Sequence, residues 1–193
     1  IDIPTDGEIA RENYIHYHCR HLEGIDFENL TEKTLRTGNY SSLLPTVRGP
    51  VKPRNLFLAD DWRRAQKATD KPVKITMPGP LTVADTVVDE YYGNQKDFGK
   101  VIAEALNHEV LSLAKAGCQH IQIDEPLFAR YPECALEFGV ENLERAFQNC
   151  PQGITRTAHM CCGYPDVIDA IDYPKAPLDS YFKIAEVIED SSV

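Results

Sequence analysis

A long amphipathic helix followed at once by a buried strand is the feature that most constrains the fold of this chain. Across residues 97–116, apolar side chains recur at the three- and four-residue spacing of a helix that buries one face. Gly117 is placed to end this helix, because glycine readily adopts the left-handed conformation found at helix ends. The β-branched run His120–Asp124 follows, so the pattern predicts a helix, a tight turn and a strand.

The same alternation of helices and strands continues along the chain. We expect strands at 72–77 and 154–158, possible further strands at 1–5 and 45–51, and helices at 58–68, 140–149 and 181–189. Strands that alternate with helices indicate a parallel sheet. The sequence therefore predicts an α/β fold of the parallel (β/α)8 TIM-barrel type, present as one domain over residues 1–193 and as an incomplete segment of about five β/α units. An open, doubly wound sheet is the competing architecture.

Charge and cysteine usage narrow the functional class. The chain of 193 residues has 30 acidic and 20 basic residues and a net charge of −10, which argues against a nucleic-acid partner. No apolar stretch is long enough to cross a bilayer, and no leader is evident at the amino terminus, so we expect a cytoplasmic protein without a membrane partner. The six cysteines are scattered and fit free thiols in a reducing compartment.

A candidate half of a metal site lies at the end of the predicted strand 154–158. His159 and Cys161 are two residues apart, and in an extended backbone such residues point to the same face. Zinc accepts an imidazole nitrogen and a thiolate sulfur, and catalytic zinc sites commonly use three protein ligands. Two ligands alone do not make a site, and a histidine beside a buried structural cysteine is the alternative interpretation.

Acidic residues follow two other predicted strands. Glu8 stands in the sequence Asp-Gly-Glu after the first candidate strand, and Asp124 and Glu125 end the strand after Gly117. In a barrel, the carboxyl ends of all strands open onto one face. Acids there could bind a substrate ammonium group, act as general acid or base, or complete a zinc site.

These motifs, in this order, resemble the catalytic barrel of the cobalamin-independent methionine synthase family. The resemblance covers nearly the whole chain and rests on DGE at 6–8, RGPVKP at 48–53, DKPVK and PGPLT within 70–82, LAKAG and IQIDEP within 113–126, and HMC at 159–161.

The resemblance implies a zinc-dependent methyltransferase that methylates the thiol of homocysteine to form methionine. His159 and Cys161 would be zinc ligands, and Glu8 and Asp124 would bind the amino group of homocysteine. The methyl donor would be methyltetrahydrofolate or another methyl carrier. No role is implied for Glu125, which could face the opposite side and serve packing or an ion pair.

The chain departs from the family pattern at two points. The remaining zinc ligands of the family, an acid and a second cysteine, are expected beyond residue 193, and Cys162 should face away from its neighbour Cys161. Thr86 stands where the family has a tryptophan that helps to form the folate site, so a large stacking surface is missing there.

Three other functions remain open at this point. A related zinc barrel could alkylate a different thiol, as the coenzyme M transferases do. A metal-free enzyme of the uroporphyrinogen decarboxylase type shares the barrel without the zinc pair. A non-catalytic protein could use zinc or thiols only for stability or association. An incomplete barrel would also expose sheet edges, which favours a homo-oligomer.

Overall fold

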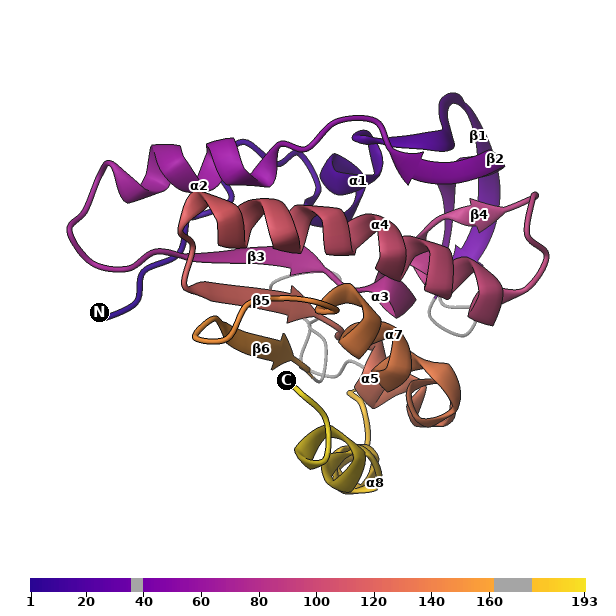
Figure 1. Cartoon of the computed structure of the whole chain (residues 1–193). Helices are drawn as coiled ribbons and strands as arrows, with labels where there is room; N and C mark the ends of the chain where they lie inside the picture. Colours follow the sequence, from indigo (N-terminus) through magenta and orange to yellow (C-terminus); the bar gives the residue numbers. More distant parts are fainter. Residues whose placement is uncertain (36–39, 162–174) are drawn as a thin grey trace, which may run out of the picture.

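A parallel three-stranded sheet lies at the centre of the computed structural model, which describes residues 1–35, 40–161 and 175–193 (Figure 1). Its order is β3 (Lys74–Pro78), β5 (His120–Asp124) and β6 (Thr155–His159). All three strands run in the same direction, and each residue of β5 pairs with one residue on either side. Thr5 adds an isolated parallel bridge to Lys74. The carboxyl ends of the strands therefore lie together at one edge.

The strands form because their apolar residues are covered by other elements. Ile75, Met77, Ile121 and Ile123 have no exposed surface. Strands buried in this way are typical of parallel sheets, in which helices cover the faces. Helix α4 (Gln95–Ala116) runs along the sheet in Figure 1.

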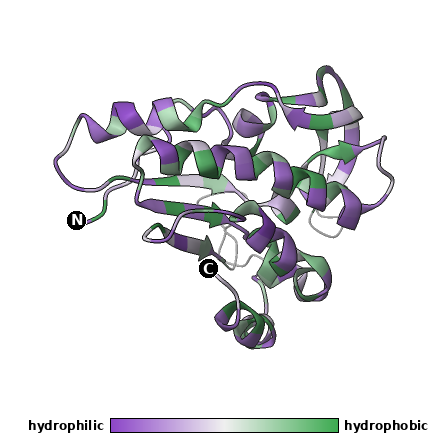
Figure 2. Ribbon diagram, viewed as in Figure 1, coloured by the Kyte–Doolittle hydropathy of each residue, from purple (hydrophilic) through white to green (hydrophobic). Residues whose placement is uncertain are grey.

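Helix α4 has a defined start and a defined end. The side chain of Asn94 accepts hydrogen bonds from the backbone N–H groups of Lys96 and Asp97, at 2.9 and 3.3 Å. Gly117 ends the helix with φ of +103°, a conformation that favours glycine. Figure 2 shows hydrophobic and hydrophilic bands alternating along α4, as expected for a helix with one buried face. The predicted helix, turn and strand are confirmed.

The other helices are shorter. They are α1 (Tyr14–Cys19), α2 (Leu58–Gln66), α3 (Pro80–Thr86), α5 (Leu127–Arg130), α6 (Pro132–Cys134), the π-helical turn η2 (Ala135–Gly139), α7 (Val140–Ala146) and α8 (Leu178–Glu189). The helices predicted at 58–68, 140–149 and 181–189 correspond to α2, α7 and α8, with different ends. Helix α4 packs against α2, α3 and α7, so the hydrophobic core is shared between the sheet and these helices.

A long β-hairpin stands apart from the parallel sheet. It consists of β1 (Leu22–Leu35) and β2 (Tyr40–Pro53), which pair antiparallel, and the short β4 (Val88–Asp89) adds to β2. The predicted strand at 45–51 exists as part of β2, but its expected place in the barrel was wrong. The burial of β1 does not alternate regularly: Leu22, Ile25 and Leu35 are buried, the middle of the strand is exposed, and the pairing with β2 is interrupted by register shifts after Glu23 and Asp26.

The sequence prediction of an α/β fold with a parallel sheet is confirmed, but the number of barrel units is not. Within the described ranges the parallel sheet has three strands and the bridge at Thr5, and it does not close into a barrel. The assignment of residues 1–193 to one domain stays a prediction. In the same ranges, none of the helices has the length and apolar character that a membrane span requires.

Candidate functional site

The register of the parallel sheet brings Asp124 and His159 together. Asp124 pairs with Pro78 on one side and with His159 on the other. The backbone N–H of Glu125 donates to the carbonyl oxygen of His159 at 2.8 Å, and that of Gly79 donates to the carbonyl of Asp124 at 2.8 Å. Two of the predicted site residues therefore occupy neighbouring strand ends.

Asp124 is held in a fixed orientation and is mostly buried. Its side chain accepts a hydrogen bond from Nε2 of Gln122 at 2.6 Å, and the residue is 9% exposed. Burial raises the pKa of Asp124 and outweighs the hydrogen bond from Gln122 and the electrostatic influence of His159, which both lower it. Glu8 raises this pKa further through like-charge repulsion. Glu8, Asp124 and His159 thus act on one another electrostatically.

Glu8 lies in the loop after the bridge at Thr5, in an uncommon backbone conformation. Its φ is +54°, and non-glycine residues at such values concentrate at functional sites. The hydroxyl of Thr76, on β3, donates a hydrogen bond to its carboxylate. The guanidinium of Arg11 forms an ion pair with the same carboxylate at 3.1 Å. Because the Glu8 side chain is still 36% exposed, it is held in place and remains accessible.

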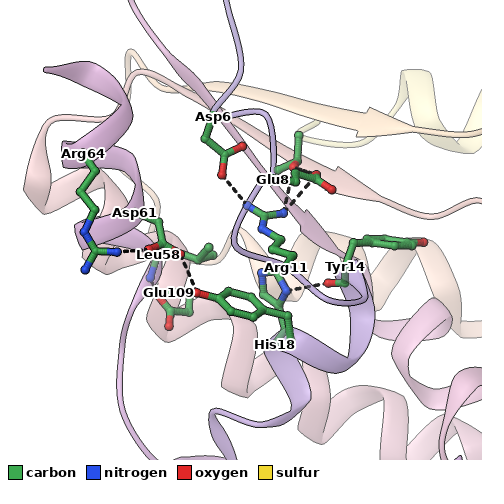
Figure 3. A network of polar contacts seen from close by, with 11 residues as sticks. Asp6, Glu8, Arg11, Tyr14, His18, Leu58, Asp61, Arg64 and Glu109 are labelled. Carbon is green, nitrogen blue, oxygen red and sulfur yellow. Dashed lines mark hydrogen bonds and ion pairs between the residues drawn. The ribbon is translucent and has the colours of Figure 1, made fainter. Parts of the chain in front are cut away.

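Arg11 organises this corner of the site, as Figure 3 shows. Its side chain is only 2% exposed and points toward both Asp6 and Glu8, with an ion pair to Asp6 at 3.0 Å. It also donates to the hydroxyl of Thr76 at 3.2 Å. Arg11 and Thr76 are 65 positions apart in the sequence, and sequence reasoning assigned neither of them to the site.

His159 and Cys161 offer a donor set that fits zinc. His159 is the exposed last residue of β6, and the partly buried Cys161 follows two positions later as a free thiol. An imidazole nitrogen and a thiolate sulfur are the ligands that zinc prefers. Among the described side chains, no third histidine, cysteine or acid forms a group with them, so a complete site needs further donors. Cys162 lies outside the described residues.

Glu125 points away from this group and stabilises helix α3. Its carboxylate accepts hydrogen bonds from the N–H of Leu81 at 2.8 Å, from the N–H of Thr82 at 3.0 Å and from the hydroxyl of Thr82 at 2.7 Å. The side chain is fully buried, and burial raises its pKa to about 7. These bonds satisfy free N–H groups in the first turn of α3. Glu125 is therefore a structural residue that joins the end of β5 to α3.

A cavity of about 290 Å³ adjoins Cys161. Its walls come from α1, the β1–β2 hairpin, α3 and the segment around α5, and the polar residues among them include His16, Asp85, Thr86 and Arg130. Two of its lining residues already stood out in the sequence, Thr86 at the position of the family's folate-site tryptophan and Cys161 as a predicted metal ligand. The other walls could not be predicted, because they come from segments that are far apart in the chain.

The comparisons with known proteins agree with the sequence motifs. Residues 1–172 match the family model described as "Cobalamin-independent synthase, Catalytic domain". The methionine synthase of Saccharolobus solfataricus is 32% identical over 165 residues, which cover 84% of this chain and 48% of that protein. The methionine synthase of Sulfolobus acidocaldarius is 27% identical over 164 residues, which cover 84% and 47%. The chain thus spans about half the length of these curated relatives.

Two solved structures are also similar. The B12-independent methionine synthase from Shewanella sp. W3-18-1, in complex with selenomethionine, aligns with a TM-score of 0.87 at 29% identity over 100% of this chain and 56% of that chain. A structure from Listeria monocytogenes, described as a putative vitamin-B12-independent methionine synthase, has a TM-score of 0.66 at 19% identity over 83% and 49% and supports the fold alone. The family matched over residues 1–172 is thus the one that the motifs resemble. The chain belongs to the cobalamin-independent methionine synthase family and contains part of its catalytic domain.

Proposed function

We propose that this chain is part of a zinc-dependent methyltransferase that transfers a methyl group to the thiol of homocysteine and forms methionine. The observation that carries the proposal is the convergence of Glu8, Asp124 and His159: Asp124 pairs with His159 in the parallel sheet, and Glu8 accepts a hydrogen bond from Thr76 on the neighbouring strand β3. Family membership supports the reaction class.

Glu8 and Asp124 are suited to bind the ammonium group of homocysteine. The charge of Glu8 raises the pKa of the partly buried Asp124 carboxyl, so a cation bound between these two acids would favour the ionised form of Asp124. Gln122 orients Asp124, while Thr76 and Arg11 orient Glu8. The amino acid would therefore be fixed at one end, with its thiol free to lie near His159 and Cys161.

His159 and Cys161 are the residues that would hold zinc. A bound zinc ion lowers the pKa of a coordinated thiol, so that homocysteine is present as a thiolate at neutral pH. The rigid end of β6 fixes His159, because the carbonyl oxygen of His159 accepts the hydrogen bond from the N–H of Glu125. The cavity beside Cys161 is the proposed site of the methyl donor, for which methyltetrahydrofolate and other methyl carriers are the candidates.

Zinc content tests the proposal in the full-length protein. We expect one zinc ion per chain in the wild type, measured by elemental analysis, and a strong loss in both His159→Ala and Cys161→Ala. His108→Ala and Cys134→Ala are matched controls, because His108 is an exposed histidine on α4 and Cys134 a free cysteine on α6. Zinc that is retained in both site variants would contradict the proposed ligands. A full-length wild type that contains no zinc and transfers no methyl group to homocysteine would favour the decarboxylase-like alternative.

A further inference from the structure

The cavity beside Cys161 contains two opposite charges that do not neutralise each other. Arg130, the last residue of α5, and Asp85, in α3, both line the cavity. Neither side chain forms a hydrogen bond or ion pair with the described part of the chain, and they do not pair with each other. By contrast, the half-buried Arg145 pairs with a carboxylate on its own helix at 2.7 Å.

Both charges act on Tyr131, which lines the same cavity. The carboxylate of Asp85 raises the pKa of the Tyr131 hydroxyl, and the guanidinium of Arg130 lowers it, so both act across the same cavity wall. The ammonium of Lys33 donates to the backbone carbonyls of Asp85 and Val87, and its charge lowers the pKa of the Asp85 carboxyl, but it forms no hydrogen bond with that carboxylate. The Asp85 carboxylate, which is partly buried, is therefore left available to a ligand.

We propose that this cavity takes a small methylated zwitterion, whose carboxylate binds Arg130 and whose cationic, methyl-bearing sulfur or nitrogen lies near Asp85. A guanidinium binds a carboxylate through two parallel hydrogen bonds, and a carboxylate favours an onium centre by charge alone. The volume of about 290 Å³ is at the low end for ligand pockets, which fits a compact molecule. The role of this ligand as methyl donor rests on the proposed function.

Methyl transfer from such a donor to homocysteine needs no oxidant and no further co-reactant. The homocysteine thiolate attacks the methyl carbon, and a new bond forms between sulfur and carbon. The bond between that carbon and the onium sulfur or nitrogen breaks, and its electron pair returns to the heteroatom. The donor leaves as a neutral thioether or tertiary amine that still carries its carboxylate. Cys161 lines the same cavity, so the methyl group would be delivered beside the proposed thiol site.

Calorimetric titration of the full-length, zinc-loaded protein tests the ligand class. The probes are glycine betaine, its isostere 3,3-dimethylbutanoate, which lacks the cationic centre, and choline, which lacks the carboxylate. Dimethylsulfoniopropionate is the sulfonium counterpart. We expect one of the two zwitterions to bind at least about tenfold more tightly than either single-charge probe, since each charge contributes a desolvated contact.

Two variants test whether Arg130 binds the carboxylate of the ligand and whether Asp85 binds its cationic centre. Arg130→Gln should weaken the zwitterion about tenfold or more and leave choline unchanged, whereas Asp85→Asn should weaken the zwitterion and leave 3,3-dimethylbutanoate unchanged. Arg54→Gln is the matched control, because Arg54 is exposed and does not line the cavity. Equal binding of all probes, or zwitterion binding that Arg130→Gln does not change, would overturn the inference.

Different results would contradict the inferred ligand class and the proposed methyltransferase function. Zwitterion binding that depends on Arg130, with no methyl transfer to homocysteine from either onium compound, would keep the ligand class and contradict its role as donor. Methyl transfer from methyltetrahydrofolate that is unchanged in both variants, with no zwitterion binding, would overturn the ligand class and leave the proposed function standing.

Discussion

Asp124 and His159 face each other across adjacent parallel strands, as the last residues of β5 and β6. This pairing places the proposed ammonium site beside the proposed zinc site through backbone hydrogen bonds alone. A shift of one residue in the register would turn each side chain to the other face of the sheet. The relative position of Asp124 and His159 in the two proposed sites is therefore set by the pairing of β5 with β6.

Glu8 and Asp124 should affect the binding of homocysteine but not the binding of zinc. In Glu8→Gln and Asp124→Asn, we expect KM for homocysteine to rise about tenfold or more, because a charge-assisted contact to the ammonium is lost. Zinc content should stay at the wild-type value. Glu12→Gln is the control, since Glu12 forms an exposed ion pair with Arg20. Steady-state kinetics on the full-length protein measure the effect, and an unchanged KM in both variants would remove these acids from the site.

Arg11→Met should destabilise the fold more than an ordinary surface substitution. The variant leaves the buried Asp6 carboxylate without its cation, and breaking such a pair costs about 3 kcal/mol of unfolding free energy. Arg63→Met removes a surface pair with Asp60 and should cost at most about 1 kcal/mol. Urea unfolding followed by circular dichroism compares the two. Equal losses would show that the Arg11 cluster contributes no more than a surface pair.

Glu125 should make stability fall as pH rises. Its pKa is about 7 in the fold against a usual value of 4.5, so the folded protein binds a proton more tightly than the unfolded chain. Its contribution is fully present below pH 4.5 and is lost as pH rises to about 7, by about 3 kcal/mol.

The difference in unfolding free energy between wild type and Glu125→Gln isolates this effect. The pKa of Glu109 is also raised to about 7 by burial. Its contribution to the pH dependence of the unfolding free energy is the same in both proteins, so it cancels in the difference. Denaturant titrations at several pH values supply the data. A difference that stays constant between pH 4.5 and pH 7 would mean that the Glu125 carboxyl titrates normally.

Gly79→Ala should disrupt the junction between β3 and α3. A Cβ atom at this position would lie 2.2 Å from Cδ of Glu125, which is held by its hydrogen bonds to α3. We expect a loss of at least about 2 kcal/mol. Gly49→Ala is the control, because its nearest neighbour, Cα of Gly24, is at an ordinary 3.9 Å. Thermal unfolding measures the stability of both variants. A Gly79→Ala protein that is as stable as Gly49→Ala would contradict the prediction.

Local patterns were sufficient to predict the central α/β units. Helix α4 carries its apolar period, its cap and its terminal glycine within one stretch of sequence, and β5 follows directly. The motif residues Asp124 and His159 could be placed at strand ends for the same reason. The register that makes them partners is a property of two strands that are distant in sequence, so it became visible only in the fold.

Features built from distant segments could not be predicted. The hairpin of β1 and β2 was missed because β1 is rich in charged and polar residues and is stabilised by pairing rather than by its own apolar pattern. Arg11 reaches Thr76 only after folding, and Arg130 and Asp85 line one cavity whose walls come from several elements. The roles of Glu8, Asp124, His159 and Cys161 stay predictions.

Zinc K-edge X-ray absorption of the full-length protein, with and without homocysteine, tests the central claim most directly. The proposal predicts one bound zinc whose coordination shell gains a sulfur atom when homocysteine is added. Cys161→Ala should lose the metal or lose one sulfur from the shell in the absence of homocysteine. A zinc shell that does not change when saturating homocysteine is added would contradict thiol activation at this site.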